Sequence, residues 1–127
     1  DVLATDHAPH TKEDKQEGMP GLSNIEVAFA MYWKVFQEEG MSLSKLSEML
    51  SRKPAELLGL PMGLLAPGME ASFILLNPHE TWILDPKKFV SRGKNNPFGG
   101  RELLGRITKT YRKGELKYDH GQAEKSC

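Results

Sequence analysis

Residues that could carry acid–base or metal chemistry gather near the start of the chain. Asp6, His7 and His10 place one carboxylate and two imidazoles within five positions, directly after the short apolar run Val2–Ala4. In α/β enzymes, inward residues at the carboxyl end of a barrel strand face the active site. The pattern therefore predicts a buried strand that ends in an acid and opens into a polar, catalytic loop.

A simpler interpretation fits the same residues. Asp6 could make an Asx-turn while both histidines face solvent. One acid and two histidines are also a weak metal signature on their own. The spacing by itself leaves both interpretations open.

Length and charge exclude several classes of protein. The 127 residues are enough for one ordinary domain. Basic and acidic residues both number 17, so nothing favours binding to nucleic acid or to an anionic membrane. No apolar run approaches the roughly 20 residues of a membrane span, and no signal-peptide pattern is present. The single cysteine, Cys127, allows no disulfide within these residues and indicates a reducing compartment, which we take to be the cytoplasm.

A polar loop and a helix are predicted next along the chain. The charged stretch 12–18 has no apolar periodicity and predicts an exposed loop, followed by a turn at Pro20-Gly21. Ser23 and Glu26 have the spacing of a capping box, which predicts that a helix begins there and ends at Gly40. Its expected core face consists of Ile25, Ala28, Phe29, Tyr32 and Phe36, widened by Trp33 and Val35.

Two shorter helical segments complete this half of the chain. Ser42 or Ser44 is the expected cap of the first, and Pro54 the first-turn residue of the second. The helical region is expected to end near Leu60.

Strand and turn signals replace helical ones after that point. Lys113-Gly114 is a typical two-residue hairpin loop. Residues 91–100 are rich in turn formers, and Arg92 with Lys94 fits either an anion site or a solvated loop. Residues 122–127 are expected to fray. The predicted strands are 72–76, 81–84, 107–112 and 115–118.

This order of elements predicts an α/β fold, with one βα unit followed by part of a small all-β module. Because the first residues already have the pattern of a buried central strand, we expect the chain to be the C-terminal part of a longer protein.

Several motifs together resemble the dihydroorotases of the amidohydrolase superfamily. The first is Thr5-Asp6-His7-Ala8-Pro9-His10-Thr11. Its Asp-His-Ala-Pro core also resembles hydantoinases, and allantoinases share its Asp-His, whereas His10 with Thr11 favours dihydroorotases. The other matching segments follow in the family's order and are Pro20-Gly21-Leu22 with Glu26, Pro54–Leu60, Gly93–Phe98 and Leu104–Ile107.

The resemblance implies a (β/α)₈ TIM barrel with a small β-sandwich formed by both ends of the chain. A complete barrel takes about 250 residues. Residues 1–60 would then supply the eighth strand, the substrate loop and the terminal helices. Residues 61–127 would supply the C-terminal part of the sandwich and a tail.

The resemblance also implies an activity and its residues. The reaction is the reversible conversion of N-carbamoyl-L-aspartate and (S)-dihydroorotate in pyrimidine biosynthesis, with one or two zinc ions. Asp6 would ligate the metal and act as the catalytic base, and His10 would contact the substrate carboxylate. The backbone of Pro20 and Gly21 would contact the substrate ring, while His7 would support the loop.

Two departures from the family pattern stand out. Ala71-Ser72 takes the place of the usual Ala-Asp before a sandwich strand. The family's paired histidines, carboxylated lysine and two later histidines are absent from this chain, and one carboxylate cannot hold a catalytic zinc, which needs about three protein ligands.

Two alternatives follow from these departures and from the shared Asp-His core. One is a related cyclic amidase of the hydantoinase or allantoinase type. The other is a non-catalytic, dihydroorotase-like scaffold subunit. The expected partners are a small-molecule substrate and either a second copy, in a homodimer, or aspartate transcarbamoylase.

Overall fold

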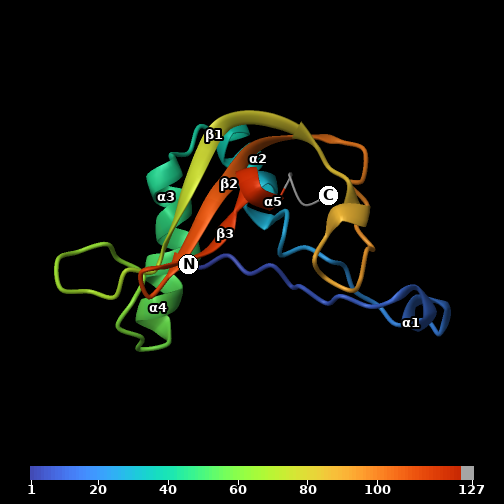
Figure 1. Cartoon of the computed structure of the whole chain (residues 1–127), viewed down its shortest axis with the longest axis horizontal. Coiled ribbons are helices and arrows are strands. Elements are labelled where there is room, and N and C mark those ends of the chain that lie inside the picture. The colour runs from blue at the N-terminus through green and yellow to red at the C-terminus, as the bar shows by residue number, and fades with distance from the viewer. Residues whose placement is uncertain (124–127) are drawn as a thin grey trace.

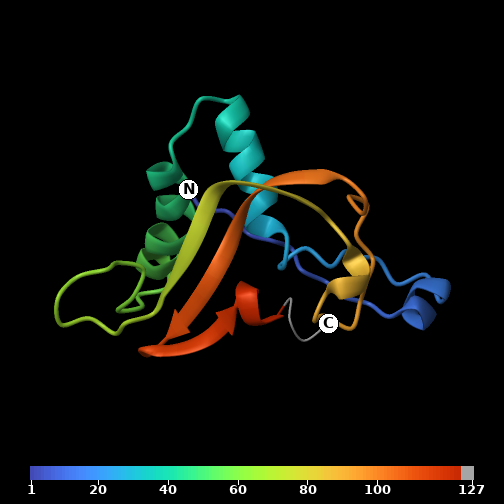
Figure 2. The same cartoon turned by 45° about the horizontal axis from the view of Figure 1, so that its top comes forward.

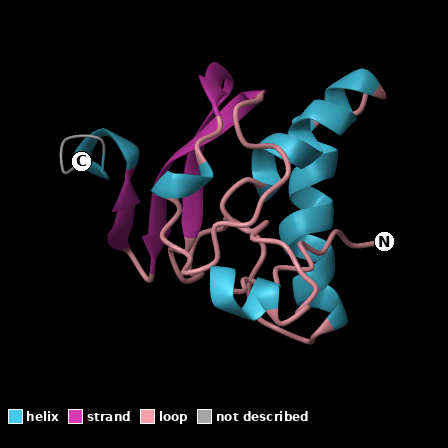
Figure 3. Ribbon diagram, turned by 90° about the vertical axis from the view of Figure 1, so that its right-hand side faces the viewer, coloured by secondary structure: helices cyan, strands magenta, loops and turns pink. Residues whose placement is uncertain are grey.

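A layer of helices lies on one face of a three-stranded antiparallel sheet (Figures 1 and 3). The computed structural model describes residues 1–123. The strands, in their order across the sheet, are β1 (Phe73–Ile83), β2 (Glu102–Arg112) and β3 (Glu115–Asp119). The α-helices are α1 (Lys12–Gln16), α2 (Ala28–Glu38), α3 (Leu43–Ser47), α4 (Lys53–Leu57) and α5 (His120–Ala123). A π-helical turn, η1 (Glu48–Arg52), joins α3 to α4, and a 3₁₀ turn, η2 (Pro86–Lys88), follows β1.

The predicted strand at Val2–Ala4 does not form within residues 1–123. The segment is paired with no strand of the sheet, and Val2 is 41% exposed. Its backbone is held by a helix instead, since the Leu3 N–H donates to the Met49 carbonyl at 3.2 Å. A strand needs a neighbouring strand for its hydrogen bonds, and all three strands of the sheet lie elsewhere.

The charged stretch after Thr11 is a short helix, so the predicted loop is also wrong. Thr11 and Asp14 form a capping box around the start of α1. The Asp14 carboxylate accepts from the Thr11 N–H at 2.8 Å, and the Thr11 hydroxyl accepts from the Asp14 N–H at 3.2 Å. The predicted exposure is confirmed, because α1 buries none of its residues.

Helix α2 packs against the sheet and supplies much of the core. It begins after Val27 rather than at Ser23, and no side chain caps it. Its end is as predicted, with Gly40 at φ 66° and the Met41 N–H donating to the Phe36 carbonyl at 2.7 Å.

The aromatic face of α2 is confirmed in part. Trp33 and Phe36 are buried, whereas Ile25 and Val35, which were expected inside, are 57% and 49% exposed. The buried clusters combine α2 with the sheet and with α3, and consist of Val27, Ala30, Leu84, Phe89 and Leu103 in one group and Trp33, Phe36 and Leu46 in the other.

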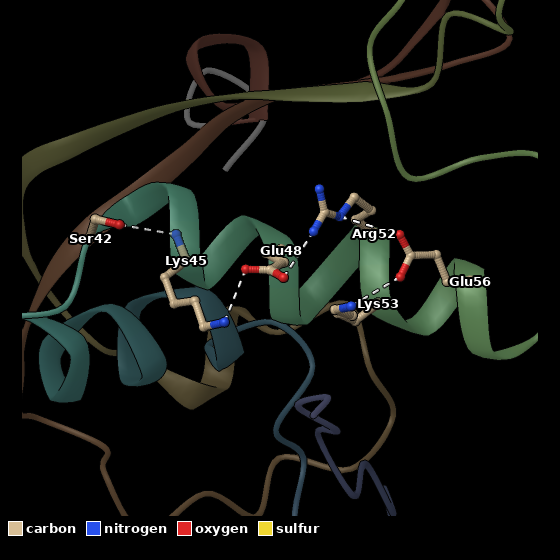
Figure 4. Close-up of polar contacts among 6 residues, drawn as sticks. All are labelled: Ser42, Lys45, Glu48, Arg52, Lys53 and Glu56. Carbon is tan, nitrogen blue, oxygen red and sulfur yellow. Dashed lines mark hydrogen bonds and ion pairs between the residues drawn. The ribbon is translucent and has the colours of Figure 1, made fainter.

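The two predicted shorter helices form one continuous helical segment (Figure 4). Ser42 caps it, with its hydroxyl accepting from the Lys45 N–H at 3.1 Å. Pro54 has no N–H to donate to residue 50, and the turn before it widens to a π-helix. Glu48 pairs with Lys45 and Arg52, each at 3.0 Å, and the hydrogen bond from Lys45 lowers the pKa of Glu48.

Two strands are much longer than predicted, and one of them, β2, begins at Glu102 rather than at residue 107. Residues 72–76 and 81–84 were expected as two strands, but β1 runs through Asn77 and Pro78. The register shifts between Asn77 and Thr81, which is a bulge of the kind that tolerates a proline inside a sheet. The β2–β3 hairpin is confirmed, with Lys113 at φ 54° and Gly114 at φ 79°.

Two further predictions concern the ends of elements and of the chain. The tail that was predicted to fray from residue 122 is wrong at its start, because Gln122 belongs to α5. Residues 124–127, including Cys127, lie outside the described part of the structure. None of the helices in residues 1–123 has the length and apolar sequence needed to cross a membrane.

Gly105 provides a test of how closely α2 packs on β2. It has φ 83°, and a Cβ there would lie 2.8 Å from Trp33 Cδ1 and 3.0 Å from Phe29 Cε1. Gly105→Ala should therefore combine backbone strain with overpacking and cost about 3 kcal/mol in urea unfolding. Gly114→Ala is the matched control, since its φ is 79° but nothing lies within 4 Å. It should cost about 1 kcal/mol. Equal losses in the two variants would contradict the close packing.

Candidate active site

Asp6 stands in an unusual backbone conformation at the start of the candidate site. Its φ is 46°, the left-handed region that aspartate tolerates better than most residues. The next residue, His7, forms a parallel bridge with Leu22, and the Ala8 N–H donates to the Leu22 carbonyl at 3.0 Å. The exposed Asp6 carboxylate makes no hydrogen bond or ion pair with any residue in 1–123. The Asx-turn interpretation is therefore wrong.

His7 is bound to the backbone that leads into α2. Its Nδ1 accepts hydrogen bonds from the N–H groups of Asn24 at 3.0 Å and Ile25 at 3.2 Å. An atom that accepts two N–H groups carries no proton, so the ring proton of neutral His7 is on Nε2. The ring thus joins the Asp6 loop to the start of α2 and is not simply a solvent-facing group.

The backbone of His10 lies directly against Gly93. A Cβ on Gly93 would be 2.6 Å from the His10 carbonyl oxygen and 2.7 Å from the His10 nitrogen. Only glycine allows that approach. The half-buried imidazole has its Nδ1 3.8 Å from the Asp14 carboxylate of α1.

Gly21 lies beside His10. A Cβ on Gly21 would be 3.2 Å from His10 Cδ2 and 2.6 Å from both Ala8 Cβ and the Ala8 carbonyl oxygen. Its φ of 134° is available only to glycine without strain. The structure thus brings Gly21 and its neighbour Pro20 next to His10. No hydrogen bond or ion pair joins the Asp6 side chain to His10 or Gly21 within residues 1–123, and the bridge between His7 and Leu22 connects the two parts of the site.

A segment from the second half of the chain holds the residues after Gly21. The buried Ser23 hydroxyl donates to the Gly93 carbonyl at 2.6 Å, and the Ser23 N–H donates to the Asn95 carbonyl at 2.9 Å. The Asn96 side chain donates to the Ser23 carbonyl at 2.9 Å. Figures 1 and 2 both show the loop that contains these residues beside the N-terminal segment that leads to α1.

The predicted capping box at Ser23 and Glu26 is wrong because both side chains bind this distant segment. The Glu26 carboxylate accepts from the N–H groups of Val90 at 2.8 Å and Ser91 at 3.0 Å. Sequence reasoning missed this role for Glu26. No local signal marked it, because Glu26 accepts from backbone N–H groups, which every residue except proline carries.

The same segment holds the two basic residues considered as an anion site. The Lys94 ammonium donates to the Phe89 carbonyl, and Arg92 is exposed. Lys94 therefore serves the loop itself, in agreement with the solvated-loop interpretation.

Residues 1–123 do not complete a metal site. They contain no group of three histidine, cysteine, aspartate or glutamate side chains placed to hold an ion. Asp6 is the one predicted metal ligand in this chain, and its carboxylate has no partner among residues 1–123. A catalytic zinc needs about three protein ligands, so this chain could supply only a part of such a site.

Comparison with known proteins identifies the family. The amidohydrolase family matches residues 1–117, and the chain belongs to this family. Among curated relatives, the dihydroorotase of Clostridium botulinum (strain Eklund 17B / Type B) is 42% identical over 93% of this chain. The dihydroorotase of Bacillus subtilis (strain 168) is 37% identical over 98% of it. The chain spans 30% of the length of each of these relatives.

Solved structures give a consistent result. The chain is similar to the L-hydantoinase (dihydropyrimidinase) from Arthrobacter aurescens, with a TM-score of 0.84 and 28% identity over 94% of this chain and 29% of that one. It is also similar to the D-hydantoinase (dihydropyrimidinase) from Thermus sp., with a TM-score of 0.85 and 26% identity over 96% of this chain and 29% of that one. The predicted amidohydrolase family and mixed α/β class are thereby confirmed.

The capping box of α1 predicts a pH dependence. Hydrogen bonds from the Thr11 backbone and hydroxyl lower the pKa of Asp14 from its ordinary 3.8, and His10 nearby acts in the same direction. Because the Asp14 pKa is lower in the folded state, its charged carboxylate stabilises α1 at pH values above its ordinary pKa. This contribution is lost as the pH falls through the pKa of the folded state. The Thr11 amide proton should therefore titrate with a midpoint below 3.8 in an NMR pH series.

The matched variants for this titration lie in the first turn of α1. Asp14→Asn should abolish the titration of the Thr11 amide proton, whereas Glu13→Gln should leave it in place. A midpoint above 3.8 would contradict the assigned hydrogen bonds.

Proposed function

We propose that this chain forms the C-terminal part of a dihydroorotase, which interconverts N-carbamoyl-L-aspartate and (S)-dihydroorotate in pyrimidine biosynthesis. The observation that carries the proposal is the likeness to curated dihydroorotases at 42% and 41% identity over nearly the whole chain. The juxtaposition of His10 and Gly21 supports it, because these are two of the residues expected to bind the substrate.

The proposed place of the chain in the complete protein follows the predicted division. Residues 1–60 form the end of a (β/α)₈ barrel, with the eighth strand, the substrate loop and terminal helices. Residues 61–127 form the C-terminal part of a β-sandwich and a tail. Val2–Ala4 has no neighbouring strand within residues 1–123, which supports this proposal, because a further barrel strand would provide one.

Asp6 is the proposed general base and a metal ligand. Its carboxylate has no partner among the described residues, so its oxygens are available to a metal and to a proton. One or two bound zinc ions would supply an acidic water near neutral pH. In ring opening, Asp6 takes the proton of the attacking water and passes it to the leaving ring nitrogen, which a carboxylate can do within one cycle.

His10, Pro20 and Gly21 are the proposed substrate contacts. An imidazole N–H of His10 can donate a charge-assisted hydrogen bond to a substrate carboxylate. The Pro20 carbonyl and the Gly21 N–H have no hydrogen-bond partner among residues 1–123, so both are available to the ring. Gly21 permits close approach because it has no Cβ.

A second candidate is a cyclic amidase of the hydantoinase type. The specific observation in its favour is the structural likeness to hydantoinases at TM-scores of 0.84 and 0.85. A non-catalytic scaffold is disfavoured by the presence of Asp6 and His10.

The proposal further places the enzyme in the cytoplasm, as a homodimer or in association with aspartate transcarbamoylase.

Removal of the Asp6 charge tests the catalytic assignment. Asparagine also tolerates the left-handed backbone, so Asp6→Asn should keep the fold while kcat for dihydroorotate ring opening falls by about 10²–10⁴-fold. Asp85→Asn, at the cap of η2, should leave kcat near wild type. Wild-type turnover in the Asp6 variant would refute the role of Asp6. A preference of the wild type for hydantoin over dihydroorotate would favour the second candidate.

The incomplete metal site gives a further expectation. Expressed alone, residues 1–127 should bind zinc no better than micromolar in calorimetry and should open neither dihydroorotate nor hydantoin. Zinc-dependent turnover by this chain alone would show that the site is complete and would contradict the proposal.

A further inference from the structure

The polar contacts around the Pro20–Gly21 peptide group are distributed unevenly. The Lys15 ammonium donates to the Met19 carbonyl at 3.0 Å and also to the Gly21 carbonyl. These two carbonyls belong to the peptide groups on either side of the Pro20–Gly21 peptide. The Pro20 carbonyl and the Gly21 N–H themselves are unpaired within residues 1–123. The Lys15 ammonium therefore binds the peptide groups on both sides of the Pro20–Gly21 peptide, whose own N–H and carbonyl have no partner among residues 1–123.

Gly21 is a residue that needs such support. Glycine has the most conformational freedom of any residue, so ordering its backbone carries the largest entropic cost. A residue with a side chain would be less flexible, but none fits at position 21, because a Cβ would lie 2.6 Å from Ala8. The Gly21 backbone is restrained through its carbonyl instead.

The Gly21 carbonyl is held from two directions. Lys15 approaches from α1, and the Asn95 side chain donates at 3.0 Å from the segment on the other side. A carbonyl oxygen has two lone pairs, and here both have a donor. The orientation of this peptide group is thus fixed by two side chains that come from separate parts of the chain.

We propose that Lys15 is a positioning residue of the substrate site, which fixes the Pro20–Gly21 peptide in the orientation that binds the ring of a cyclic amide. This inference rests on the proposed function, which assigns the ring to that peptide. Lys15 does not touch the ring. It acts through the two carbonyls that it holds, and its loss lets the peptide group rotate away from the binding orientation.

The charge of Lys15 suggests a competing explanation, in which the ammonium merely attracts an anionic substrate. Lys12 provides the control. It lies on the same short helix and is exposed, and its ammonium makes no hydrogen bond or ion pair with any described residue. Lys12→Met removes the same charge from the same helix without changing the contacts of Gly21.

The kinetic test uses the complete protein and dihydroorotate. Lys15→Met should raise KM about tenfold, equivalent to 1.4 kcal/mol, with kcat changed less than about twofold. Lys15→Arg retains a donor and should recover most of the lost affinity. Lys12→Met should leave both constants within about twofold of wild type.

A spectroscopic test observes the contact without any turnover. In protein labelled with ¹³C at glycine carbonyls and ¹⁵N at leucine, only Gly–Leu pairs give carbonyl–amide correlations. This chain contains three such pairs, at Gly21-Leu22, Gly59-Leu60 and Gly63-Leu64. Lys15→Met should shift the Gly21 carbonyl signal and leave the other two unchanged, which also verifies that the variant is folded.

The outcomes separate the contact, the role and the proposed function. An unchanged Gly21 signal in Lys15→Met overturns the contact. A shifted signal with unchanged KM, or an equal rise of KM in Lys12→Met, overturns the positioning role. A wild-type protein that opens neither dihydroorotate nor hydantoin overturns the proposed function and with it the role of Lys15, while the Gly21 signal still decides the contact.

Discussion

Ser23 is buried at 1% exposure, and its hydroxyl donates to the Gly93 carbonyl at 2.6 Å. Leaving a buried polar group unpaired costs about 1–3 kcal/mol, so this hydrogen bond ties two distant segments firmly together. Gly93 lies in turn against the backbone of His10. The position of His10, and of Gly21 beside it, thus depends on a hydrogen bond between residues 70 positions apart.

Two capping-box patterns in this chain behave differently, and their surroundings explain why. Thr11 and Asp14 lie at the start of a helix that buries none of its residues, and they bind each other's backbone there. Glu26 instead meets the N–H groups of Val90 and Ser91, which lack other partners, and Ser23 meets Gly93. Where a loop packs against a potential helix start, its unpaired backbone groups compete for the capping side chains.

Local backbone signals were sufficient for several elements. The hairpin at Lys113-Gly114, the end of α2 before Gly40 and the cap at Ser42 were all predicted, because each depends on the conformation of only a few neighbouring residues. Pro78 shows the limit of such signals. It was expected to end a strand, but a bulge absorbs it and Trp33 donates to its carbonyl at 3.0 Å.

The sequence by itself determined the family, the positions of most helices and strands, and the residues that are candidates for chemistry. The tertiary structure decided how those residues are used. It left Val2–Ala4 outside the sheet, committed His7 to the backbone before α2 and brought Asn95 to Gly21 from 74 positions away. Backbone preferences act over a few residues, so they can be read in order along the chain. These contacts depend instead on packing between distant segments, and no local sequence pattern indicates which distant segments will meet.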